Sequence, residues 1–203
     1  MIDTLCRLLD AGVTQFHVVK ECEDILLDHD YRKLDIGERW ELMAGGRYYV
    51  KPYPSMLVAF AIGEVPEYGR LNIGLAHTDF PMLKIKTQPD MNRCGYQTLN
   101  VEPYGGLIKE TWFDRPLGIA GKVVVQTEDP FRPRTYLYDS ERAMCIVPSL
   151  APHLRKETTG DKMNVQKELI PVYGLNGQNV KEKDILQYVV DDLGLLKLSL
   201  IHI

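Results

Sequence analysis

The 203-residue sequence has no apolar run of about 18 residues or more, the usual minimum for a membrane-spanning helix, so we expect no membrane partner. It opens with Met1-Ile2-Asp3, and an acid in this place is not typical of the basic start of a secretory signal. It has no excess of positive charge either, because 24 Lys and Arg stand against 28 Asp and Glu, a net charge of −4. This balance argues against nucleic acid as a partner, since nucleic-acid-binding domains carry basic patches.

The sequence is also poor in cysteine and has no Cys-x-x-Cys pair. Scattered cysteines without such a spacing are typical of intracellular proteins whose thiols stay reduced. We therefore expect reduced, mostly buried thiols in a cytoplasmic protein. The four cysteines are Cys6, Cys22, Cys94 and Cys145.

A nearly continuous apolar run, 71–76, is followed by His77, Asp79 and Pro81. Such a run predicts a strand that is buried on both faces of a parallel or mixed sheet. The strand should end before Pro81, because proline cannot donate a hydrogen bond to a neighbouring strand. Ligands of open α/β sheets bind at the carboxyl ends of strands, so His77 and Asp79 are candidate site residues.

His77 and Asp79 are two residues apart, which places their side chains on the same side of an extended chain. An imidazole can bind a metal through one nitrogen while a carboxylate fixes its tautomer through the other. The alternative is a histidine at a strand end that bonds an aspartate of the following turn without any metal. Two residues alone do not decide between these interpretations.

The remaining patterns predict helices near both ends of the chain and strands between them. Apolar residues at helical spacing predict helices over 5–12, 14–26 (capped by Thr14) and 181–193. Aromatic and β-branched residues predict a strand pair at 47–50 and 56–62, and further strands at 84–86, 97–101, 118–126 and 135–138. The chain is therefore expected to combine an α/β part with a β-rich part.

Six short blocks then occur in one order: 14–19, 46–50, 76–81, 101–106, 111–117 and 150–154. They read TQFHVV, GRYYV, AHTDFP, VEPYGG, TWFDRPL and LAPHL. Each block alone is a weak signal, but six blocks in this order and spacing are specific for one protein family. Over residues 10 to 195, approximately, the chain resembles the N-terminal half of the M18 metalloaminopeptidases, the family of aspartyl aminopeptidase and aminopeptidase I.

The resemblance implies an α/β, zinc-exopeptidase-like catalytic domain that is interrupted by a β-rich dimerisation domain. The N-terminal part of the catalytic domain would span 1–88, and the inserted domain, truncated at its C-terminal end, would span 89–203. The resemblance further implies a pair of zinc ions and peptide substrates that lose an N-terminal residue, often an acidic one. Self-association from dimers up to dodecamers is implied as well.

Carried over residue by residue, the resemblance makes His77 a metal ligand and Asp79 the catalytic carboxylate that supports it. It places His153 among the functional histidines of the metal site, where a neighbouring subunit supplies it. Ser149 and Pro152 predict the cap and first turn of a short helix around His153.

The block at 111–117 has an interpretation that needs no cofactor. Trp112, Phe113 and Arg115 are more typical of a core or an interface, where Trp and Arg are enriched, than of cofactor contacts. Asp114 could form a local pair with Arg115, and we assign it no catalytic role.

Nothing after His153 matches the rest of the family's site, which comprises a bridging Asp, a Glu-Glu pair with the general base, another Asp and a final His. The simplest interpretation is a fragment of an aminopeptidase that is inactive alone. One alternative is a catalytically silent fragment that assembles or binds. Another is an M42-like dinuclear zinc exopeptidase, which would not be expected to carry the block at 111–117.

Overall fold

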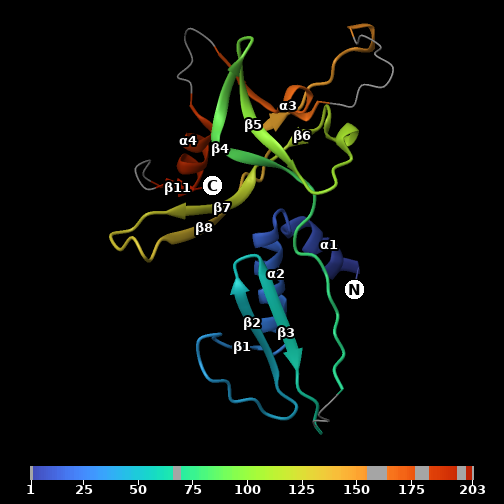
Figure 1. Cartoon of the computed structure of the whole chain (residues 1–203), viewed down its shortest axis with the longest axis vertical. Helices are drawn as coiled ribbons and strands as arrows, with labels where there is room; N and C mark the ends of the chain where they lie inside the picture. Colours follow the sequence, from blue (N-terminus) through green and yellow to red (C-terminus); the bar gives the residue numbers. More distant parts are fainter. Residues whose placement is uncertain (1, 66–69, 155–163, 177–182, 196–199, 203) are drawn as a thin grey trace. The chain divides into compact units, whose positions relative to one another are not determined.

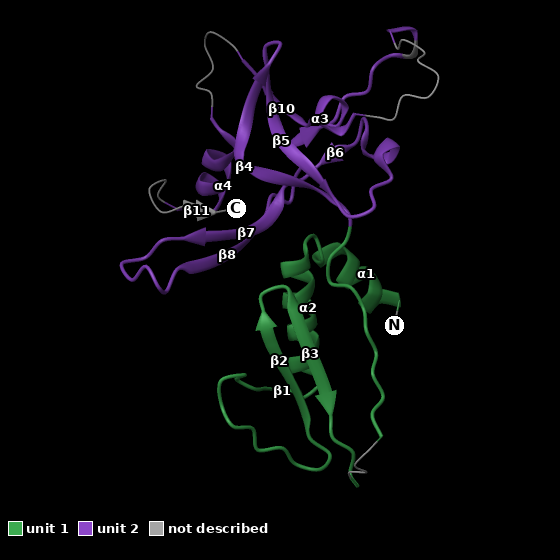
Figure 2. Ribbon diagram, in the orientation of Figure 1, with its two compact units in different colours: residues 1–80 green, residues 81–203 purple. Residues whose placement is uncertain are grey.

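The computed structural model describes residues 2–65, 70–154, 164–176, 183–195 and 200–202 (Figure 1). The chain forms two compact units, 1–80 and 81–203, which are coloured separately in Figure 2. The division falls at 80/81, whereas the boundary expected from the sequence, 88/89, lies inside the strand β4 (Met82–Arg93). In the described residues, no helix has both the length and the apolar character needed to cross a membrane.

Unit 1 begins with two helices, both predicted from the sequence: α1 (Ile2–Ala11) and α2 (Gln15–Asp28). Thr14 caps α2 as expected, because its hydroxyl accepts a hydrogen bond from the His17 backbone N–H at 3.4 Å. The apolar stripe of α1 is not covered by the rest of the unit, since none of its residues is buried. The buried residues of the two helices therefore all belong to α2, where they are Val19 and Glu23.

A three-stranded sheet completes unit 1, in the order β1 (Arg32–Lys33), β2 (Arg47–Tyr53) and β3 (Met56–Ala61). β2 and β3 form the antiparallel pair that the sequence predicted, and β1 runs parallel to β2. Successive residues of β2 face opposite sides of the sheet. Tyr48 and Val50 pack with Leu34 on one side, whereas Tyr49 reaches Glu23 of α2.

Unit 2 is rich in β-structure and contains two sheets, with strand orders β4-β5-β10-β9-β6 and β11-β7-β8. Its four longest strands, β4, β5, β7 and β8, each overlap a strand predicted from the sequence, although β4 is far longer than the predicted 84–86. After β4, the elements are β5 (Tyr96–Tyr104), η1 (Lys109–Trp112), β6 (Pro116–Leu117), β7 (Ala120–Val125), β8 (Arg134–Asp139), β9 (Cys145–Ile146), η2 (Pro152–Leu154), α3 (Val165–Glu168), β10 (Val172–Leu175), α4 (Ile185–Asp192) and β11 (Leu200–His202).

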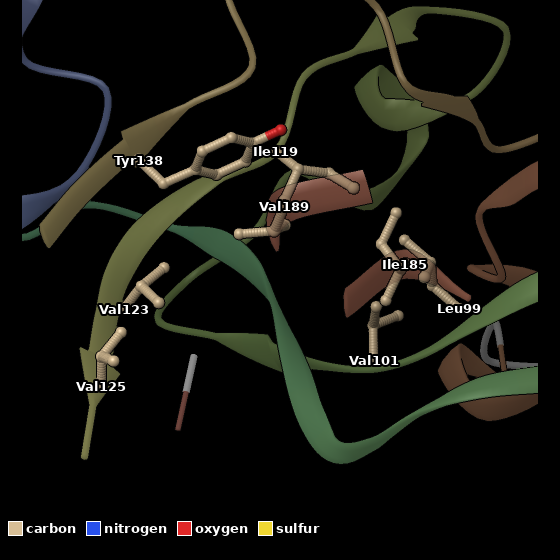
Figure 3. Close-up of a cluster of buried hydrophobic side chains, with 8 residues drawn as sticks. All are labelled: Leu99, Val101, Ile119, Val123, Val125, Tyr138, Ile185 and Val189. Atoms are coloured by element: carbon tan, nitrogen blue, oxygen red, sulfur yellow. The ribbon is translucent and has the colours of Figure 1, made fainter. Parts of the chain in front are cut away.

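The core of unit 2 lies where α4 meets strands of both sheets (Figure 3). Ile185 of α4 lies beside Leu99 and Val101 of β5, and Val189 lies nearer Ile119. Asp90 of β4 also accepts a hydrogen bond from the Ile185 backbone N–H at 3.0 Å, which fixes the start of α4. The helix and the sheets therefore form one packed body with its own core.

The strand predicted at 71–76 is wrong. This segment has no regular secondary structure, and Leu71, Ile73 and Leu75 are 81%, 70% and 93% exposed. A strand forms only where neighbours satisfy its backbone hydrogen bonds, and a doubly apolar strand also needs cover on both faces. Among the described residues the sheet of unit 1 ends at β3, and no further strand pairs with 71–76. The apolar pattern therefore shows that the segment is suited to a buried strand. It does not show that neighbouring strands are present to pair with it.

The cysteines follow the sequence-based expectation in one respect only. All four are free thiols, as predicted. They are not mostly buried, however, because Cys6 and Cys94 are exposed and the other two are half-buried. Cys6 lies on the uncovered helix α1 and Cys94 in the turn between β4 and β5, two places where the chain has little to pack against.

We expect Leu75→Lys to change the free energy of unfolding by no more than about 0.5 kcal/mol, because substitutions of exposed side chains usually have effects of that size. The comparison variant is Val19→Ala in the same unit, where the side chain is 1% exposed and its loss should cost about 2 kcal/mol. Urea unfolding measures both. A loss for Leu75→Lys as large as that for Val19→Ala would mean that 71–76 is packed in solution.

Candidate functional site

His77 and Asp79 form a hydrogen-bonded pair in unit 1. The His77 Nδ1–H donates to Asp79 Oδ1 at 2.9 Å. The strand before them is absent and the chain bends at Thr78, yet the two side chains lie within hydrogen-bonding distance of each other. The intervening Thr78 anchors the segment, since its hydroxyl donates to Ser55 O at 2.8 Å. Ser55 lies in the turn between β2 and β3, so the pair is tied to the hairpin.

Both side chains of the pair are open to solvent. The His77 side chain is 90% exposed, and that of Asp79 is 36% exposed. Because Nδ1 bonds the carboxylate, Nε2 is the nitrogen that can bind a metal. A carboxylate in this position also makes the imidazole a stronger donor to a metal. The geometry expected from the His-x-Asp spacing is therefore present.

The described residues do not fit a complete zinc centre. A catalytic zinc ion normally takes three protein ligands and keeps one open position. Within the part of the chain that the structure describes, there is no group of three or more His, Cys, Asp or Glu side chains that could hold a metal. The pair supplies at most one imidazole ligand and its supporting carboxylate.

His153 lies in unit 2, in the single 3-10 turn η2 that forms where the sequence predicted the start of a short helix. Its side chain is exposed, as the sequence-based prediction required. His77 and His153 belong to different units, and the predicted site residues that bond each other within one unit are His77 and Asp79.

One contact near His153 was not predicted. Asp114 Oδ1 accepts a hydrogen bond from the Ser149 backbone N–H at 2.9 Å, whereas the sequence suggested only a local pair with Arg115. The two bonded residues are 35 positions apart, and no spacing rule connects positions so distant. Trp112 and Phe113 are half-buried, which agrees with their interpretation as packing residues.

The comparisons with known proteins give one consistent family. A family model described as aminopeptidase I zinc metalloprotease (M18) matches residues 8–201. A probable M18 family aminopeptidase 2 from Clostridium acetobutylicum is 36% identical over 184 residues, which are 88% of this chain and 42% of that protein. Its counterpart from Stutzerimonas stutzeri is 37% identical over 193 residues, 94% of this chain and 44% of its own length. The chain thus spans less than half the length of these relatives.

Solved structures show the same similarity. A chain of the Ape4 and Nbr1 complex has a TM-score of 0.83 and 28% identity, over 98% of this chain and 41% of that chain. The Chaetomium thermophilum mApe1 structure has a TM-score of 0.80 and 26% identity, over 97% of this chain and 48% of that one. The fold is therefore a mixed α/β fold of the kind found in these structures.

The matched family is one of metalloproteases, and the mixed α/β fold of this chain agrees with it. More specifically, the chain belongs to the M18 family of aminopeptidase I zinc metalloproteases, because the family model matches nearly its whole length. This assignment favours M18 over the M42-like alternative.

Proposed function

We propose that the chain is the N-terminal part of a zinc-dependent aminopeptidase, which removes N-terminal residues, acidic ones among them, from peptides. The observation that carries the proposal is the His77–Asp79 hydrogen bond of 2.9 Å, at the block that the sequence shares with the family. In this proposal His77 Nε2 is a ligand of one of two zinc ions. Asp79 holds the neutral His77 ring with its proton on Nδ1, the tautomer that binds metal through Nε2.

We propose further that 81–203 mediates self-association, with a cytoplasmic homo-oligomer as the working form. The separate core of this unit supports the idea, because a packed body can present a rigid surface to a second copy. The sequence-based domain limits, 1–88 and 89–203, differ from the observed division at 80/81 by the first part of β4. His153, exposed on this unit, would then reach the metal site of a neighbouring subunit.

A second candidate function is assembly or binding without catalysis. It is favoured by the donor set, since the described residues hold no group of three metal-binding side chains. The two candidates differ in one respect that can be measured, namely whether His77 and His153 contribute to hydrolysis when the rest of the family's site is supplied.

A hybrid enzyme provides that test. In the hybrid, residues 1–203 replace the matched segment of the Clostridium acetobutylicum relative, which supplies the remaining length. His77→Ala and His153→Ala hybrids should each be weakly active, but an equal mixture should recover about a quarter of the unmodified activity. A quarter is the fraction of shared sites that pair an intact His77 with an intact His153 when identical subunits associate at random.

The control for mixing is His29→Ala. His29 is an exposed histidine of unit 1 whose Nδ1 bonds Ile25 O at 2.8 Å, so its loss should leave the hybrid active in any mixture. Activity is measured as release of the N-terminal residue from an aspartyl peptide after subunit exchange. No recovery at any ratio of the two inactive variants would contradict sharing of His153 between subunits.

A further inference from the structure

Asp114 joins two segments of unit 2 that are far apart in the sequence. Its backbone N–H donates to Val147 O, and its Oδ1 accepts from the Ser149 N–H, both at 2.9 Å. The preceding residue, Phe113, forms a β-bridge with Val147. The segment 147–149 is therefore held at both of its ends by a single residue.

The backbone of Asp114 is in an uncommon conformation. Its φ is 57°, in the left-handed region that Asp and Asn enter more readily than other residues with a side chain. Three other non-glycine residues of the described chain have positive φ: Asp30, Cys94 and Glu141. Among these four, only Asp114 has a side chain bonded to backbone 35 positions away. Residues held in rarely populated conformations cluster at functional places, which makes Asp114 a candidate for a role beyond packing.

The segment 147–149, which Asp114 holds, leads directly to His153. Val147 is fully buried and follows β9, which pairs with β6 and β10. Beyond Ser149 the chain leaves the sheet, and Leu150, His153 and Leu154 are all exposed. Exposed side chains contribute little to fixing a segment by packing, so the hydrogen bonds at its base carry more of that task.

An aspartate elsewhere in unit 2 forms a local hydrogen bond, in contrast to the long-range bond of Asp114. Asp129 Oδ1 accepts from the Phe131 N–H at 2.9 Å, two residues on, within the loop between β7 and β8. Such a bond only shapes its own turn. Asp114 uses the same chemistry, a carboxylate on a backbone N–H, across two elements of the fold. Because its partner Ser149 lies shortly before His153 in the chain, this bond can also affect where His153 lies.

We propose that Asp114 is a positioning residue, which sets the direction in which the chain leaves the sheet and hence the place of His153. The inference rests on the role that the proposed function gives to His153. Aspartate suits the position because its side-chain oxygen accepts the hydrogen bond and because Asp tolerates the left-handed backbone. Asp114 touches no reacting group in this scheme and acts only through the segment that it holds.

Three variants separate the hydrogen bond from the backbone conformation. Asp114→Asn keeps an acceptor oxygen and the tolerance of positive φ. Asp114→Gly keeps that tolerance but removes the acceptor. Asp129→Gly removes an equivalent acceptor from a loop remote in sequence from His153, and it serves as the matched control.

The first measurement uses the chain as it is. In Asp114→Gly, the Ser149 amide should exchange with solvent at least about tenfold faster, and 150–154 should show lower NMR order parameters. Urea unfolding should give Asp114→Gly and Asp129→Gly similar stabilities, and Asp114→Asn should match the unmodified chain. Unchanged order at 150–154 in Asp114→Gly, or the same loss of order in Asp129→Gly, would overturn the proposal.

The second measurement uses the hybrid enzyme and separates this proposal from the proposed function. Asp114→Gly should lower kcat about tenfold with little change in KM, since a misplaced group affects the chemical step more than binding, and Asp114→Asn should restore it. If 150–154 becomes less ordered while kcat stays unchanged, the positioning role of Asp114 is supported and the catalytic role of His153 is contradicted. If 150–154 stays ordered, the positioning role of Asp114 is overturned.

Discussion

The 203-residue chain alone is expected to hydrolyse an N-terminal aspartyl peptide at least about a thousandfold more slowly than a full-length M18 relative, even with added zinc. The reason is its set of donors: the described residues offer His77 and Asp79 but no third neighbour, and a catalytic zinc ion needs three ligands. A thousandfold deficit corresponds to about 4 kcal/mol of barrier, a typical result of removing an essential part of a site.

The measurement compares three proteins under one protocol: the chain, the Clostridium acetobutylicum relative, and the hybrid of the two. The hybrid is the essential control, because an active hybrid shows that residues 1–203 are competent once the remaining length is supplied. Activity of the chain alone within about tenfold of the relative, a gap of only about 1.4 kcal/mol, would show that this sequence holds a complete site.

The sequence predicted local features of the fold well and non-local ones poorly. The β2–β3 hairpin and the Thr14 cap depend on residues close in sequence, and both are present. The strand at 71–76 failed because strand formation depends on neighbours that the pattern of one segment cannot supply. The hydrophobic pattern of a segment shows which of its faces are apolar. It does not show whether a neighbouring strand is available to pair with it.

The same distinction applies to the candidate site. The contact between His77 and Asp79 was predicted from their spacing, although the chain bends at Thr78 between them. The bond from Ser149 to Asp114 was not, because it depends on how β6 and β9 pair in the folded unit. Sequence spacing therefore identified the pair that could bind a metal, whereas only the structure identified the residue that holds the segment before His153.

A third non-local feature, the carboxylate of Glu23, dominates the electrostatics of unit 1. Glu23 lies on α2, is buried, and accepts hydrogen bonds from Lys33 and Lys51, both at 2.6 Å, and from the Tyr49 hydroxyl at 3.1 Å. Burial raises the pKa of the Glu23 carboxyl, but the three hydrogen bonds outweigh it and bring the pKa down to about 2. Burial and the bond to Glu23 together raise the pKa of Tyr49 to about 12. The cluster fastens α2 to the sheet.

Glu23→Gln should destabilise unit 1 by about 2 kcal/mol at pH 7 and by much less at pH 2. A carboxyl whose folded pKa lies below its unfolded value, here 4.5 for a free Glu, adds stability above pH 4.5. That stability is lost as pH falls from 4.5 through the folded pKa of about 2, below which both states bind the proton. The full shift would be worth about 3 kcal/mol, but Lys33 is half exposed and its share is screened by solvent.

Urea unfolding at pH 7, 4.5, 3 and 2 measures the difference between Glu23→Gln and the unmodified chain. The matched control is Glu21→Gln on the same helix, because Glu21 pairs with the exposed Arg7 at 2.8 Å and should contribute less than about 1 kcal/mol at any pH. The stability curves of the unmodified chain and of Glu23→Gln should converge as pH falls, since a protonated Glu and a Gln are both neutral and of similar shape. A difference that stays constant from pH 7 to pH 2 would show that Glu23 stabilises the unit by packing and not by its charge.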